Sequence, residues 1–112
     1  MSAEWGNRLS ALIKSVGNLA KTNKPVANAF HGLETATREN SVLDAKTHEL
    51  IAIAVAVTTR CDGCISAHVA AAKKAGATKD EIGAAVGTAI ALNAGAAFVY
   101  SARVMAARKL GN

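Results

Sequence analysis

The stretch from Asp44 to Thr59, DAKTHELIAIAVAVTT, decides the fold predicted for this chain. Its isoleucines and valines alternate with alanines, a pattern that would also suit a β-strand. We favour a helix over residues 45–59, because alanine is the strongest helix former and the segment is longer than a typical strand. Asp44 supplies an N-cap carboxylate for the free N–H groups of the first turn. After Glu49 the helix is apolar nearly all round, so we expect it to be buried.

Helical signals continue on both sides of this segment. An apolar stripe with three- and four-residue spacing runs along the N-terminal part of the chain, and Pro25 suits the first turn of a second helix. Gly76 is a typical left-handed helix stop, and Thr78 with Glu81 has the spacing of a capping box. The chain is therefore predicted to be all-α, a helical bundle of about six helices in a single domain, residues 1–112. The expected helices span residues 9–20, 25–38, 45–59, 61–75, 78–93 and 94–110.

The composition predicts more apolar surface than one small core can hide. The 112 residues are 51% hydrophobic and 4% aromatic, and alanine, valine, isoleucine and leucine supply most of the apolar content. A lone chain of this length buries only a modest fraction of its unfolded surface. We therefore expect the remaining apolar surface to be covered by self-association.

Charge and hydropathy patterns argue against several classes of partner. The net charge of +5 is spread without a long basic run, and with so few aromatic residues it does not favour a nucleic-acid surface. The longest apolar run, Leu50–Val57, is far shorter than the roughly 18 residues that indicate a membrane span. The N-terminal MSAEWGNRLS lacks the basic start and apolar core of a secretory signal, so no membrane partner and a cytoplasmic location are expected.

Residues that can carry chemistry gather next to the central helix, in CDGCISAH, Cys61–His68. In a reducing compartment, two cysteines three positions apart suit redox chemistry or metal binding better than a structural disulfide. A helix N-terminus favours the thiolate, and this spacing brings the sulfurs of Cys61 and Cys64 within bonding reach. His68 lies one turn after Cys64 and can hold or relay a proton. Glu49, on the preceding helix, is a candidate general base because burial disfavours its charged form.

The same residues support other hypotheses. The two cysteines, the histidine and the glutamate could be four zinc ligands, although structural zinc sites prefer more thiolates and imidazoles. A disulfide could instead serve a non-enzymatic, redox-sensing oligomer by changing its partner surface. The simplest alternative is that the cysteines are small buried hydrophobes and that Glu49 pairs with a lysine. His31 and His48 have no comparable support as functional residues.

The spacing of these four residues resembles a known family. Glu49, eleven intervening residues, Cys61-x-x-Cys64 and then His68 match the core of the AhpD-like alkylhydroperoxidases in the carboxymuconolactone decarboxylase-like family. The similarity extends through LDAKTHELIAIAVAV before the motif and AAKKAGATKDEI after it. It implies an all-helical bundle that assembles as a homotrimer or homohexamer, with the active site near subunit contacts.

The resemblance also implies a reaction. Cys64 would attack an organic hydroperoxide or hydrogen peroxide, Cys61 would resolve the product as a disulfide, and Glu49 with His68 would relay protons. No cofactor or metal is implied, and the reductant would be an external dithiol such as a dihydrolipoyl protein. Gly63 departs from the pattern, because AhpD itself has a relay histidine just before the second cysteine. The decarboxylases that name the family generally lack the cysteine pair, so decarboxylation is not expected.

Overall fold

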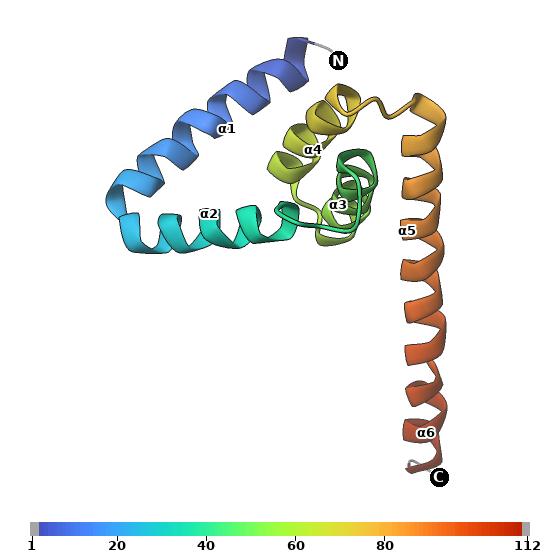
Figure 1. Ribbon diagram of the computed structural model, residues 1–112. Helices are drawn as coiled ribbons and strands as arrows, with labels where there is room; N and C mark the ends of the chain where they lie inside the picture. Colours follow the sequence, from blue (N-terminus) through green and yellow to red (C-terminus); the bar gives the residue numbers. More distant parts are fainter. Residues whose placement is uncertain (1–2, 111–112) are drawn as a thin grey trace.

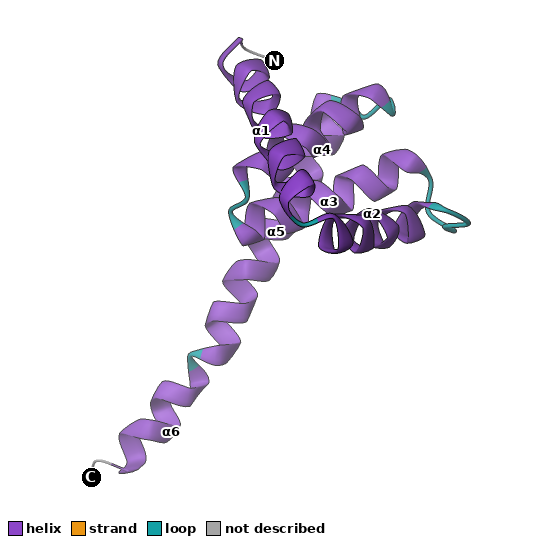
Figure 2. Cartoon of the chain, turned by 90° about the vertical axis from the view of Figure 1, so that its left-hand side faces the viewer, coloured by secondary structure: helices purple, strands orange, loops and turns teal. Residues whose placement is uncertain are grey.

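The computed structural model describes residues 3–110, which form six α-helices and contain no strand (Figures 1 and 2). The prediction of an all-α fold with about six helices is confirmed. The helices are α1 (Ala3–Thr22), α2 (Lys24–Arg38), α3 (Ala45–Thr59), α4 (Asp62–Lys74), α5 (Lys79–Tyr100) and α6 (Ala102–Leu110).

The core lies where α3 packs between α4 and α5, with α1 against the other side of α4 (Figure 1). Its buried hydrophobic side chains are Ile53 and Ala56 on α3, Ala72 on α4 and Ala89 on α5. Three of these four are alanines, so the helices meet through short side chains. As expected, α3 carries several of the buried residues, although one face of the helix, including Ile51, is open to solvent in the single chain.

The turn between α3 and α4 consists of two residues and sets the position of the first cysteine. Arg60 adopts the left-handed conformation at φ 55°, and its N–H bonds to the carbonyl of Val57 at 3.2 Å. The N–H of Cys61 bonds to the carbonyl of Ala56 at 3.1 Å, which completes a Schellman motif. Cys61 is then the N-cap of α4. The predicted stop at Gly76 is confirmed in the same way, with φ 91° after α4.

The end of the chain differs from the prediction. A helix boundary was expected between residues 93 and 94, but α5 continues to Tyr100, and α6 follows after Ser101 alone. Gly95 does not break the helix, because an interior glycine costs only about 1 kcal/mol relative to alanine. Asn93 faces α3, and its side-chain amide donates to Thr58 Oγ1 at 2.9 Å and to the Ala89 carbonyl at 2.7 Å.

Beyond its contact with α3, α5 continues with α6 away from the other helices (Figure 2). The radius of gyration is 18.3 Å, against roughly 13 Å for a compact chain of this length. The accessible surface is 8440 Å², against about 5,800 Å² for a folded monomer of this mass. Among the described residues, Lys79–Lys109 is long and apolar enough to cross a membrane by length and composition alone, with mean hydropathy 1.7 and 6% of its apolar window buried. Glycines on α5, at positions 83 and 87, have no neighbouring atom where a side chain would start, so no other described helix approaches α5 closely at these positions.

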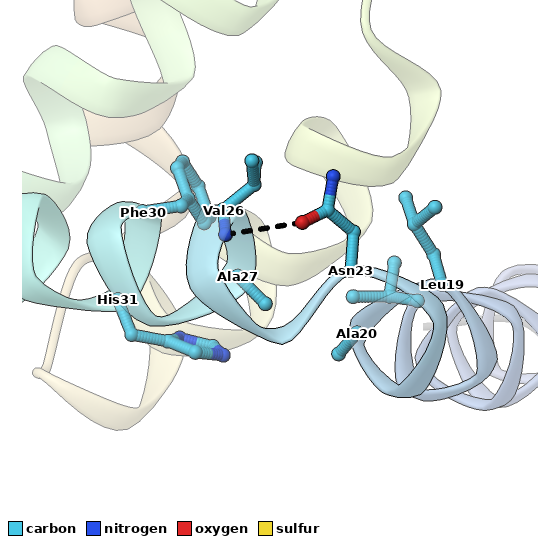
Figure 3. Close-up of a pocket in the computed structure, with 8 residues that line it drawn as sticks. Leu19, Ala20, Asn23, Val26, Ala27, Phe30 and His31 are labelled. Atoms are coloured by element: carbon cyan, nitrogen blue, oxygen red, sulfur yellow. Dashed lines mark hydrogen bonds between the residues drawn. The ribbon is translucent and has the colours of Figure 1, made fainter.

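The corner between α1 and α2 carries a second apolar surface (Figure 3). Asn23 caps α2 by accepting a hydrogen bond from the N–H of Val26 at 3.4 Å. The corner encloses a cavity of about 200 Å³, lined by residues that include Val16, Leu19 and Phe30. These three side chains are about half exposed or more, so this corner is incompletely covered within the single chain.

Candidate functional site

The two cysteines lie at the first turn of α4 and are joined in a disulfide, with their Cα atoms 5.2 Å apart. Cys61 Sγ also accepts a hydrogen bond from the N–H of Cys64 at 3.2 Å. That N–H is one of the free donors of the helix N-terminus, which favours negative charge on the sulfur of Cys61 when the disulfide opens. Both cysteines are partly accessible to solvent. The sulfurs of Cys61 and Cys64 are therefore within bonding reach, as their spacing in the sequence predicts.

Glu49 and His68 form a second pair, with His68 one helical turn after Cys64. The Nδ1 atom of His68 lies 2.6 Å from Oε2 of Glu49, which links α4 to α3. The Glu49 side chain is 4% exposed and that of His68 is 23% exposed. A buried carboxylate must be compensated by hydrogen bonds or an opposite charge. Because His68 lies four residues after Cys64 on α4, this pair continues the same helix face as the second cysteine.

Arg38, from the last turn of α2, is a member of this cluster that the sequence did not reveal. Its guanidinium lies 3.2 Å from Oε1 of Glu49, the carboxylate oxygen that His68 does not use. One alternative drawn from the sequence pairs Glu49 with a lysine. The cation found beside Glu49 is an arginine from another helix. A cavity of about 140 Å³ borders Arg38 and Glu49, and its other lining residues include Ser41 and His48. The signal that could have located Arg38 is the general need of a buried carboxylate for a cation.

Gly63 is explained by the contact between α1 and α4. A Cβ atom at this position would collide with Cδ2 of Leu12, and Cδ1 of the same side chain would be 3.3 Å away. The same two residues line a cavity of about 330 Å³ between α1 and α4. Leu12 therefore takes up space that the family's histidine side chain would need.

The N-terminal end of α3 is held by two polar contacts that help to place Glu49. The Thr47 N–H donates to Asp44 Oδ1 at 2.8 Å, and this hydrogen bond lowers the pKa of the Asp44 carboxyl. Lys46 lies 2.8 Å from Glu81 of α5; the contact raises the pKa of Lys46 and lowers that of Glu81. The predicted N-cap at Asp44 is confirmed, as is the capping box of Glu81 with Thr78.

The structure thus places the predicted residues in two pairs. The disulfide of Cys61 and Cys64 lies at the start of α4, and the hydrogen bond of His68 with Glu49 joins α4 to α3. Within residues 3–110, no group of three His, Cys, Asp or Glu side chains is arranged to hold a metal ion. The described residues therefore supply no set of side chains that supports the zinc hypothesis. His31 lies on exposed α2, 3.7 Å from Glu34, and is not part of the cluster.

Comparisons with known proteins agree with this architecture. The chain is 53% identical over 107 residues to an uncharacterized protein of Haemophilus influenzae, covering 96% of this chain and 95% of that protein. It is 34% identical over 92 residues to uncharacterized protein 4 in the cox locus of Paracoccus denitrificans, covering 82% and 83% of the two chains. The crystal structure of an apo carboxymuconolactone decarboxylase family protein from Legionella pneumophila superposes with a TM-score of 0.77 at 30% identity, covering 90% of each chain.

The family model agrees with these pairwise similarities. The model described as the carboxymuconolactone decarboxylase family matches residues 24–107, a range that includes all four predicted site residues and Arg38. The match begins at the first residue of α2 and reaches into α6. This chain therefore belongs to the carboxymuconolactone decarboxylase family.

Proposed function

We propose that this protein is a thiol-dependent peroxidase that reduces organic hydroperoxides or hydrogen peroxide. The reduced Cys64 thiol gives its proton to His68, and its thiolate attacks one peroxide oxygen. The O–O bond breaks, the leaving alkoxide takes the proton from His68 to become an alcohol, and Cys64 becomes a sulfenic acid. The sulfur of Cys61 then attacks Cys64, forming the disulfide and releasing the oxygen as water.

An external dithiol completes the cycle by supplying two electrons and two protons. One of its thiolates attacks the sulfur of Cys64 and displaces Cys61, whose developing charge is stabilised by the N–H of Cys64. The second thiol of the reductant then attacks the mixed disulfide and releases Cys64. A dihydrolipoyl protein is a reductant of this chemical class. Continued turnover needs a reducing compartment, so we place the protein in the cytoplasm.

The observation that carries this proposal is the 2.6 Å contact between His68 and buried Glu49, one turn past a disulfide-forming cysteine pair. A carboxylate accepts hydrogen bonds and cannot donate them, so it holds the His68 proton on Nδ1. The other ring nitrogen, Nε2, is then free to accept the proton of a thiol. A structural disulfide alone would need no such pair, which is why the proton relay supports a reaction.

The proposal is tested by adding cumene hydroperoxide to the reduced protein and titrating the remaining thiols. The parent should lose both thiols and form the Cys61–Cys64 disulfide. Cys61→Ser should react once and leave a sulfenic acid that dimedone labels at Cys64. Cys64→Ser should not react, and the pre-oxidised parent is the matched control for peroxide loss that does not depend on the thiols. Peroxide consumption by Cys64→Ser at the rate of the parent would refute the assigned role.

A redox-sensing oligomer is the second candidate, and the contact of Gly63 with Leu12 favours it. A side chain at position 63, such as the relay histidine of AhpD, would have to displace the end of the Leu12 side chain. The contact also lies beside the disulfide, so oxidation could change how α1 packs on α4. This candidate expects oxidation to alter assembly while peroxide turnover stays negligible. Sedimentation of the oxidised and reduced protein, measured together with turnover, separates the two functions.

We also propose that the protein assembles with copies of itself, as a homotrimer or homohexamer. The exposed area exceeds that of a folded monomer by roughly 2,600 Å², which is as large as the surface one subunit buries in an obligate oligomer. The α5–α6 helices and the α1–α2 corner both leave large apolar side chains exposed, and the corner is hollowed by a cavity whose lining includes Leu19 and Phe30 (Figure 3). Phe98, 83% exposed on α5, is a suitable probe. Phe98→Asp should lower the mass measured by light scattering, and a monomeric parent at micromolar concentration would refute the assembly.

A further inference from the structure

We propose that Arg38 is a positioning residue for the proton relay: it holds Glu49 as a carboxylate whose second oxygen faces His68. This inference deepens the proposed peroxidase function and rests on it for its effect on turnover. Its structural content, the arrangement of Glu49 and His68, can be measured without any peroxide.

The first step of the argument is the burial of Glu49. Its side chain is 4% exposed, and an ionised carboxylate removed from water is costly unless it is paired and hydrogen-bonded. Arg38 lies 3.2 Å from Oε1, and His68 lies 2.6 Å from Oε2. Each carboxylate oxygen therefore has its own partner. With Oε1 held by the guanidinium, the carboxylate plane is oriented so that Oε2 points to the imidazole.

The second step concerns charge. Arginine remains protonated over the whole range in which histidine titrates, so Arg38 is a permanent cation beside Glu49. Other charged groups near this end of α3 are already engaged: Lys46 is paired with Glu81 of α5. On the α4 side, Asp62 contacts Arg8 of α1 at 3.4 Å. His48 lines the cavity beside the carboxylate and is charged only when protonated.

The third step is the consequence for His68. While Glu49 is ionised it can only accept, so the His68 proton resides on Nδ1 and Nε2 remains the acceptor. Without Arg38 nothing holds Oε1 of Glu49, so the carboxylate can turn away and the Nδ1–H of His68 loses its acceptor. An imidazole with no acceptor at Nδ1 can carry its proton on Nε2, the nitrogen that must accept from the thiol. Arg38 thereby selects the useful tautomer without touching sulfur or peroxide.

The experiment compares Arg38→Gln and Arg38→Lys with Arg103→Gln. Gln keeps a hydrogen-bond donor without the charge, and Lys keeps the charge. Arg103 is the matched control, an exposed arginine on α6 that stacks on Tyr100 at 5.1 Å and lies outside the site. The first measurement is the ¹⁵N chemical shifts of the two His68 ring nitrogens in the oxidised protein, which differ between the two tautomers. The second is the rate of peroxide-driven thiol loss as a function of pH.

The expected results distinguish positioning from a purely structural role. Arg38→Gln should shift the His68 population from the Nδ1–H to the Nε2–H form and reduce thiol loss about tenfold at neutral pH, with a smaller reduction at higher pH, where the thiol loses its proton without the relay. Arg38→Lys and Arg103→Gln should keep the parent's tautomer and pH profile. An unchanged His68 signature in Arg38→Gln, or a loss of rate that is equal at all pH values, would overturn the inference. If the parent itself does not consume peroxide, the proposed function fails, and the ring signature still decides the role of Arg38.

Discussion

Replacement of Glu49 by glutamine should slow the reaction at this site and change the free energy of unfolding only slightly. Gln has nearly the same shape and keeps an oxygen that can accept from Arg38 or His68, but it carries no charge. The ion pair with Arg38, at 3.2 Å, and the hydrogen bond with His68, at 2.6 Å, would become neutral or be lost. An interaction of this kind with a charged group contributes about 1.5–3 kcal/mol. Against this loss, a carboxylate that is 4% exposed no longer has to be desolvated, which relieves several kcal/mol.

The two effects on stability nearly cancel because both partners of Glu49 keep access to water. The Arg38 side chain is 50% exposed and can be solvated when its partner becomes neutral. We therefore expect the free energy of unfolding of Glu49→Gln, measured by urea denaturation, to lie within about 2 kcal/mol of the parent. The proton relay has no such compensation. General acid–base catalysis contributes about 10²- to 10⁴-fold, so peroxide-driven thiol loss should slow by a factor in this range.

Glu34→Gln is the matched control for this experiment. Glu34 also faces a histidine, His31 at 3.7 Å, but this pair lies on the surface of α2. Its replacement should change neither the rate of thiol loss nor the stability by more than about 0.5 kcal/mol. A Glu49→Gln protein that oxidises within about threefold of the parent rate would refute the reasoning, as would an equal loss of rate in Glu34→Gln.

Three further predictions concern the surrounding structure. Thr78→Ala removes the N-cap of α5 and should lower the free energy of unfolding by about 1 kcal/mol, measured in urea; an unchanged midpoint would contradict the capping role. Gly63→Ala should displace the end of the Leu12 side chain, so its effect on the free energy of unfolding should couple with that of Leu12→Ala by about 0.5–3 kcal/mol; fully additive effects would contradict the contact. The hydrogen bond from Thr47 lowers the pKa of Asp44, so its stabilisation is complete above the ordinary value of 3.8 and is lost as the pH falls through the lowered pKa; Asp44→Asn should flatten the acid slope of stability, and an identical slope would contradict this.

Features that depend on neighbouring residues in the chain could be predicted from the sequence. The N-cap at Asp44, the capping box of Thr78 with Glu81 and the stop at Gly76 each depend on backbone groups within a few residues, so local chemistry identifies them. The Cys61–Cys64 disulfide belongs to the same class, because three-residue spacing around one helical turn brings the two sulfurs together. The resemblance to the family added Glu49 and His68 to this local pattern.

Contacts between different helices could be decided only by the tertiary structure. Arg38 reaches Glu49 because the connecting residues 39–44 bring the end of α2 beside the start of α3, and no periodicity in the sequence encodes that approach. Leu12 occupies the space beside Gly63 because α1 packs on α4. The continuation of α5 past Gly95 depends on the small energetic cost of one glycine in an otherwise uninterrupted helix. Local hydrogen bonding determines where helices begin and end, whereas the partner of a buried charge is determined by packing over the whole chain.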